Sequence, residues 1–457
     1  MRELPIKELI EEEIKTKNSL SQEFTFWSLI KFAFPTIIMM LFTSMYTVVD
    51  GIFVSRLINT DALSAVNIVY PMISIIGAIA VMFGTGGSAI IARKMGEGDM
   101  KTAKESFSLI VFVGVTIGVI IAAIGLIFIN KIIYSLGASD VLSKYCFDYL
   151  WILLLFAPAA ILQMLFQSFF ITAGKPTLGL IVIVFAGVIN AIFDYIFMGP
   201  MNMGISGAAL ATSMGFMIPS VFGMVYFARK KDLIYFVRPA LNWKVIIESC
   251  KIGSAEMVTQ LSTGIVTFLF NILMMNYLGE DGIAAITIVM YTQFVLIALY
   301  LGFSLGVAPV ISYNYGSNNT NQLKRIFKTC MIFIGGSSIA MFGVAMLFLT
   351  NFVSVFSPSG TVVYDIAIRG FFLFSFSYLF VGFNIFIALL FTALSNGKIA
   401  LIISLSRTLI FVALGLALLT QFLQVDGVWL AIPFAEILTI ILCMVLLKKE
   451  NQIYHYM

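Results

Sequence analysis

Long apolar stretches separated by short polar breaks make up most of this chain. A stretch of about 20 apolar residues can cross the hydrocarbon core of a bilayer as a helix. A lone segment in lipid satisfies its backbone hydrogen bonds only as a helix, so each stretch predicts a membrane-spanning helix. The predicted spans are 27–54, 62–92, 106–129, 146–172, 177–198, 204–228, 248–278, 283–314, 326–350, 364–392, 399–420 and 427–447.

The same pattern occurs twice, because the sequence of residues 27–228 is similar to that of residues 248–448. Identical residues recur at an offset of 220 that later becomes 223, as in Thr43 and Thr263, Phe83 and Phe303, Gly96 and Gly316, and Gly174-Lys175 and Gly397-Lys398. Six spans in each half make the repeats parallel, which is a common build of secondary transporters. The sequence therefore predicts an all-α integral membrane protein with twelve transmembrane helices. These form two six-helix lobes related by a pseudo-two-fold axis along the membrane normal.

Positive charges set the orientation of these helices. With both termini in the cytoplasm, the tails and cytoplasmic connections hold nearly all of the 27 Lys and Arg residues, as the positive-inside rule requires. The exceptions are Arg56, Lys131, Lys144, Arg369 and Arg407. The predicted parts are a cytoplasmic tail, a first lobe, a cytoplasmic linker, a second lobe and a cytoplasmic tail, at 1–26, 27–228, 229–247, 248–448 and 449–457.

Composition agrees with a chain whose main solvent is lipid. It is 60% hydrophobic and 11% charged, whereas soluble domains are about 25% charged. The net charge of +4 reflects membrane orientation and not nucleic-acid binding. The four cysteines have no metal or disulfide spacing, and the single histidine, His455, lies in the C-terminal tail. With no nucleophile–base motif in the membrane, we expect a protein that is not an enzyme and needs no cofactor.

Two carboxylates are predicted to lie inside the membrane in the first half, although an ionised side chain there costs at least ~2.5 kcal/mol. Asp50 lies late in the first span and Asp194 late in the fifth, and both spans run outward. Asn190 lies one turn before Asp194, and Thr212 in the sixth span adds a hydroxyl. Crowded carboxylates and oxygen ligands suit H⁺ or Na⁺, so these residues form a candidate coupling site.

A structural role is the alternative for both carboxylates. Asp50 could cap a helix end or pair with Arg56, and Asp194 could bond to the backbone. The repeat favours the coupling site, because the equivalent second-half positions are Phe270 and Ala417. A role in packing the fold would more naturally occur in both halves.

The second half carries its own intramembrane charges. Arg407 and Glu436 are predicted to form a buried salt bridge or small network, since a lone charge there would be costly. A second coupling or substrate site is the rival interpretation of this pair. Arg369 is predicted to pair with Asp365, one turn before it.

Amide, methionine and aromatic side chains within the spans are candidates for lining a central cavity, because such faces suit apolar cations. The candidates are Met39, Phe42, Tyr46, Asn67, Tyr70, Gln163, Met164, Gln167, Gln260, Tyr291 and Gln293.

Several segments resemble motifs of the multidrug and toxic compound extrusion (MATE) family. These are Val49 to Arg56 after Pro35, Ala65-Val66, the Gly96-Glu97-Gly98 loop and Asn314-Tyr315-Gly316. Asn190 to Asp194 and Gly207 to Thr212 resemble its fifth and sixth helices, particularly in the DinF-like and MepA-like branches. The resemblance covers about residues 27–448.

The resemblance implies an antiporter with a central cleft, from which substrate leaves as H⁺ or Na⁺ enters. It also implies a first-lobe site made of Asp50, Asn190, Asp194, Thr212 and the backbone carbonyl of Ala208. The NorM-like branch has carboxylates in its seventh and tenth helices. This sequence has Ser262-Thr263 in the seventh and no mid-membrane acid in the tenth.

We therefore expect a cation-coupled antiporter of the cell membrane that exports amphipathic organic cations or drugs, an activity tied to xenobiotic transport and antibiotic resistance. Its partners would be these small molecules and membrane lipids, and a chain with both lobes can work as a monomer. The alternative is a flippase for lipid-linked precursors on a related scaffold. A dianionic cargo would need several basic residues in the cleft, whereas only Arg369 and Arg407 are available, both with expected acidic partners.

Overall fold

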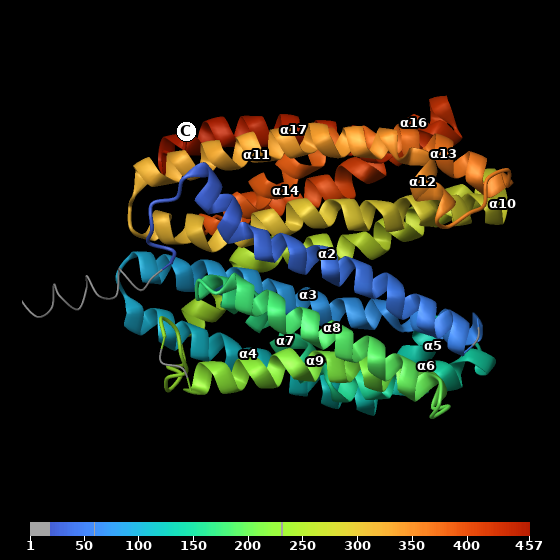
Figure 1. Ribbon diagram of the computed structural model, residues 1–457, viewed down its shortest axis with the longest axis horizontal. Helices are drawn as coiled ribbons and strands as arrows, with labels where there is room; N and C mark the ends of the chain where they lie inside the picture. The colour runs from blue at the N-terminus through green and yellow to red at the C-terminus, as the bar shows by residue number, and fades with distance from the viewer. Residues whose placement is uncertain (1–18, 59, 230–231) are drawn as a thin grey trace, which may run out of the picture.

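The computed structural model describes residues 19–58, 60–229 and 232–457, of which residues 47–57, 60–61 and 63 are described by their backbone alone. Every regular element in these residues is helical (Figure 1). The first half forms α2 (Phe26–Leu57), α3 (Thr60–Gly96), α4 (Met100–Ile127), α5 (Ile129–Ser135), α6 (Asp140–Leu155), α7 (Ala157–Thr172), α8 (Pro176–Met198) and α9 (Gly204–Arg229). The second half forms α10 (Trp243–Gly316), α11 (Thr320–Leu347), α12 (Leu349–Ser354), α13 (Val362–Ser375), α14 (Tyr378–Ala393), α15 (Gly397–Leu405), the π-helix η1 (Ser406–Ile410), α16 (Phe411–Leu423) and α17 (Val425–Tyr454).

Two predicted spans are each split into a bent pair of helices. α6 and α7 meet at 55°, and α13 and α14 meet at 54°. Pro158 at the start of α7 has no N–H for the helical ladder, which accounts for the first bend. The second bend has no proline, and a tight turn forms there in which the Ser377 N–H donates to the Phe374 carbonyl.

α10 contains two predicted spans in one element. Gly279 interrupts it with φ of 65° and ψ of −148°, a conformation that glycine adopts readily. In the described residues, nine helices are long and apolar enough to span a membrane, and the two bent pairs raise that number to 11. Because α10 supplies one span on each side of Gly279, the helices match the twelve predicted spans.

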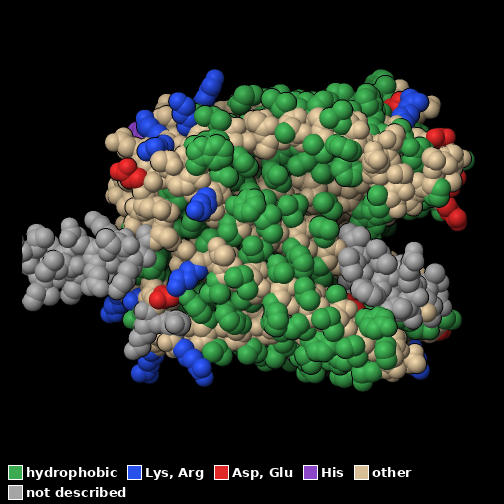
Figure 2. Space-filling model, viewed as in Figure 1, with side chains coloured by type: hydrophobic (Ala, Val, Ile, Leu, Met, Phe, Trp, Pro, Cys, Tyr) green, Lys and Arg blue, Asp and Glu red, His purple; other side chains and the backbone are tan. Residues whose placement is uncertain are grey.

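The helices form two lobes, α2–α9 and α10–α17, which lie one above the other in Figure 1. We call the end of the molecule at which α3 and α9 finish the basic end, because Lys and Arg side chains gather there (Figure 2). Its exposed cations include Lys101, Lys324, Arg325 and Lys328. At the opposite end, which we call the outer end, Figure 2 shows the molecule hollowed between the lobes.

The lobes meet closely at the basic end through glycines. A Cβ at Gly96 would overlap the carbonyl oxygen of Tyr313, and a Cβ at Gly316 would overlap the carbonyl oxygen of Arg93. Gly96 and Gly316 are equivalent in the repeat, so each lobe offers the same small residue to the other. Arg93 also forms a salt bridge with Glu248 across the interface, with 2.8 Å between Nη2 and Oε1.

Candidate functional site

The first-lobe site is built on one buried face of α8. Asn190 and Asp194 lie one turn apart on this helix and are only 2% and 1% exposed. Two glycines bring the neighbouring helices close to that face. A Cβ at Gly187 would overlap the Phe42 ring of α2, and one at Gly215 of α9 would lie 3.3 Å from the Asn190 Cβ.

Thr212 of α9 differs from most hydroxyl residues in these helices. Its neighbour Ser213 donates to the Ala209 carbonyl one turn back, at 2.7 Å, as helical serine and threonine commonly do. The Thr212 Oγ1 is buried and has no hydrogen-bond partner among the described residues, and the same holds for the Asn190 Nδ2. Buried polar atoms in this condition point to a site completed by water or an ion.

Ala208 and Asp50 complete the predicted set. Ala208 is 1% exposed and lies one turn before Thr212 on α9. The Asp50 side chain lies outside the described part of the chain, so only its place in α2 is known. That place is eight residues after Phe42, which packs at Gly187, and Asp194 is seven residues after Gly187. Since both predicted spans run outward, the two positions lie at similar depth, about 10–12 Å beyond this contact.

The second lobe has no polar counterpart at the equivalent positions. Phe270 is fully buried in the apolar core of the second lobe, and Ala417 is exposed on α16. Within the described residues, no three His, Cys, Asp or Glu side chains gather as a metal site in either lobe. The polar chemistry of the first-lobe site is therefore not repeated in the second lobe.

Arg407 and Glu436 are in contact in the second lobe. The Arg407 Nε lies 2.9 Å from the Glu436 Oε1 and 3.2 Å from Oε2. Asn384 of α14, which was not singled out from the sequence, donates from Nδ2 to the Glu436 Oε2 at 2.6 Å and to its backbone carbonyl at 2.9 Å. Arg407 lies in the π-helix, whose wider turn re-aims side chains. Glu256 of α10 lies within electrostatic reach of Arg407.

The pairing predicted for Arg369 is wrong. Its Nε donates to the Asp426 Oδ1 at 2.8 Å, so it connects α13 to the start of α17 instead of pairing with Asp365 on its own helix. Asp365 has the one-turn spacing at which helical side chains can pair. In the folded structure, however, the Arg369 guanidinium makes two hydrogen bonds to the Asp426 carboxylate.

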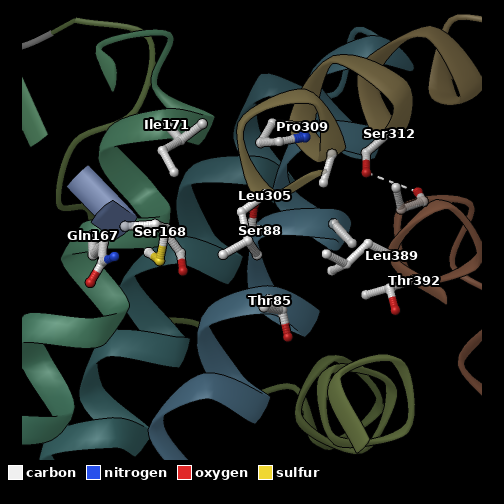
Figure 3. A pocket seen from close by; sticks show the side chains of 14 residues that line it. Thr85, Ser88, Gln167, Ser168, Ile171, Leu305, Pro309, Ser312, Leu389 and Thr392 are labelled. Atoms are coloured by element: carbon white, nitrogen blue, oxygen red, sulfur yellow. Dashed lines mark hydrogen bonds between the residues drawn. The ribbon is translucent and has the colours of Figure 1, made fainter. Parts of the chain in front are cut away.

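A small cavity of about 40 Å³ lies between the lobes, lined by α2, α3, α7, α10 and α14 (Figure 3). Its polar lining is Thr85, Ser88, Gln167, Ser168, Ser312 and Thr392. Ser88 shares a 2.6 Å hydrogen bond with Thr172, and Ser312 donates to the Ala393 carbonyl at 2.8 Å. The space suits a few water molecules, not an organic substrate. Single hydroxyls in apolar stretches gave no sequence signal for this cluster.

Of the predicted cavity residues, Gln167 lines this cavity. Met39 is fully buried against Ile171 and Ile183 inside the first lobe. Tyr291 lines an open groove at the outer end with Phe356, whose ring lies 6.2 Å away, and Tyr70 of the other lobe is exposed. The remaining candidates are partly buried or exposed and do not line either space: Phe42, Tyr46, Asn67, Gln163, Met164, Gln260 and Gln293.

Known proteins resemble this chain in sequence. The sequence profile of the MatE family matches residues 35–196 and 256–416, one segment in each lobe. The chain is 28% identical over 344 residues to the multidrug export protein MepA of Staphylococcus haemolyticus, covering 74% of this chain and 75% of the relative. It is 26% identical over 350 residues to MepA of Staphylococcus saprophyticus, with 74% and 75% covered.

Solved structures share the fold. A crystal structure of MATE in complex with MaL6 matches with a TM-score of 0.89 and 22% identity, covering 94% of this chain and 97% of the other. The outward-facing conformation of a multidrug resistance MATE family transporter of the MOP superfamily matches with a TM-score of 0.88 and 22% identity, covering 94% and 96%. The predicted fold class and family resemblance are thereby confirmed, and the chain belongs to the MatE family of transporters.

Proposed function

We propose that this protein is a cation-coupled antiporter that exports amphipathic organic cations across the cell membrane by alternating access. The family and the relatives named multidrug export proteins support export of small molecules. The observation that carries coupling is the buried polar cluster on α8 and α9, in a lobe whose repeat partner is apolar at the same positions.

The proposed coupling ion is H⁺ or Na⁺, held by Asp50, Asn190, Asp194, Thr212 and the Ala208 carbonyl. A carboxylate that is protonated or bound to Na⁺ no longer carries an uncompensated charge in a low-dielectric lobe. Loading the site would therefore stabilise one arrangement of α2, α8 and α9 over another. Such differential binding is what an ion needs to shift a conformational equilibrium.

The proposed orientation places both termini and the basic end in the cytoplasm, as the distribution of Lys and Arg favours. The close glycine contacts at Gly96 and Gly316 would then close the cytoplasmic side, while the hollow between the lobes faces outward. Membrane lipid would surround the lobes, and a single chain would carry the complete transport path as a monomer.

The test is ethidium efflux from energised cells or everted vesicles, comparing the wild type with Asp50→Asn and Asp194→Asn. Both variants keep the size of the side chain but cannot be ionised, so each should lose efflux at normal expression. Asp140→Asn, at the exposed start of α6, is the control and should pump normally. Imposed Na⁺ or pH gradients then identify the ion. Normal efflux by both site variants would disprove the coupling site.

A further inference from the structure

The segment that precedes α2, Ser19–Thr25, crosses the basic end of the molecule (Figure 1). At its start it contacts the first lobe. The Ser19 Oγ donates to the carbonyl oxygen of Gly174, in the turn between α7 and α8, at 3.1 Å. Gly174 has φ of 71°, and a side chain there would overlap the Ser19 hydroxyl, so glycine allows this contact.

The same segment contacts the second lobe a few residues later. The Gln322 Nε2 of α11 donates to the Phe24 carbonyl at 3.3 Å, and Gln322 is itself buried. Ser21 lies near Tyr313, close to the end of α10. A stretch of six residues therefore bonds to both lobes.

Burial along the segment is selective. Leu20 and Phe24 are 0% and 1% exposed, whereas Gln22 and Glu23 between them are exposed. The Phe24 ring packs edge-to-face on Phe32 of α2, with 5.6 Å between centroids. Leu20 and Phe24 belong to a hydrophobic core that continues through both lobes at this end. Such burial indicates a docked segment and not a solvated tail.

We propose that Ser19–Phe24 is an interlobe strap that stabilises the arrangement in which the lobes meet at the basic end. Opening that end separates Gly174 from Tyr313 and Gln322, whereas six residues span at most about 20 Å even when fully extended. The strap must therefore release one lobe in each transport cycle. In the closed state the strap acts together with the Gly96 and Gly316 contacts, but it lies outside the membrane-spanning helices.

The proposal rests on alternating access for its effect on transport but not for its structural claim. Interlobe distance at the basic end can be measured without any substrate or coupling ion. If the strap proposal is wrong, substitutions in the strap leave the interlobe distances unchanged. If the proposed function is wrong, the wild type shows no efflux.

The experiment places spin labels on Lys101→Cys and Asn321→Cys, which are exposed and equivalent in the two lobes, after replacement of the four native cysteines. Pulsed electron-spin distance measurements on the purified full-length protein report the separation of the lobes. Leu20→Ala with Phe24→Ala should raise the ratio of open to closed populations at the basic end by about fivefold or more. Gln22→Ala with Glu23→Ala, in the same segment but exposed, should leave it unchanged.

Substitutions that remove a single hydrogen bond test the strap with less risk of unfolding the protein than the loss of two buried apolar side chains. Ser19→Ala removes the bond to the first lobe and Gln322→Ala removes a bond to the second, so each should shift the distances in the same direction. Because the strap works only when both ends are docked, the double variant should shift them by less than the two single effects combined. Unchanged distances, or a lower thermal stability without a distance change, would overturn the proposal.

Discussion

At the scale of single residues, the first-lobe site contains buried polar atoms that have no hydrogen-bond partner among the described residues. The Thr212 hydroxyl makes no hydrogen bond to its own helix, whereas the Ser213 hydroxyl donates to the Ala209 carbonyl one turn back. Buried polar atoms are rarely left without partners, and those that are generally belong to sites that bind water or an ion or that have a chemical role. The predictions at this scale concern Thr212 and the Arg407–Glu436 pair.

Replacing Thr212 with valine should weaken coupling without unfolding the protein. The change removes Oγ1 at nearly constant volume, and no bond between described residues is lost with it. We expect roughly a tenfold lower apparent affinity for the coupling ion, equivalent to about 1.4 kcal/mol. Ion-dependent efflux measures this change. Ser213→Ala is the control, and an equal loss of ion affinity in both variants would contradict a specific role for Thr212.

Replacing Arg407 with methionine should destabilise the second lobe by about 3–5 kcal/mol, because Glu436 would keep a buried charge without its cation. Adding Glu436→Gln removes that charge and should recover much of the loss, while an amide can still bond to Asn384. Thermal unfolding in detergent measures both effects. If the double variant is stable but does not transport, the pair has a functional role besides the structural one.

At the scale of elements, the repeat is visible in how helices begin. Asp99 caps α4 by accepting from the Thr102 N–H, and Asn319 caps α11 in the same way from the Gln322 N–H, both at 3.1 Å. The two caps are equivalent in the repeat, yet only one can titrate. The Thr102 side chain, its backbone N–H and the nearby Lys94 and Lys101 hold the pKa of Asp99 below its usual value.

The start of α4 should therefore be sensitive to acid, and the start of α11 should not. A carboxyl whose pKa is lowered in the folded state stabilises that state above the unfolded pKa of about 3.9. The contribution is lost as pH falls through the folded value. Hydrogen exchange of the first turns of α4 and α11 measures this difference. Asp99→Asn should remove it, and equal protection of both helices in acid would contradict the assignment.

At the scale of the whole molecule, the position of the lobes depends on close backbone contact at the basic end. Gly96→Ala adds a Cβ that would overlap the Tyr313 carbonyl, so it should favour separation of the lobes there. Gly336→Ala in α11 is the matched control, because a Cβ at Gly336 meets nothing within 4 Å. The Lys101 and Asn321 label pair measures both. Equal distances in the two variants would show that this contact does not hold the lobes.

The sequence by itself determined the helices, the repeat and the family. Apolar length decides what spans a bilayer, and a span must be a helix, so both follow from local composition. It also located Asn190 and Asp194 on a common helix, since one-turn spacing places side chains on one face. The contact between Arg407 and Glu436 was predicted because few charges were available in that lobe.

Only the tertiary structure decided which distant side chains meet. Arg369 bonds to Asp426, Asn384 joins Glu436, and the polar interlobe cavity brings together hydroxyls from separate helices. Serine and threonine are common in apolar spans, so no periodicity marks the few that line a space. The docking of Leu20 and Phe24 depends on both lobes being folded against each other. Helix formation is local in sequence, whereas these contacts join residues that lie 52, 57 and 298 positions apart, and no local pattern encodes them.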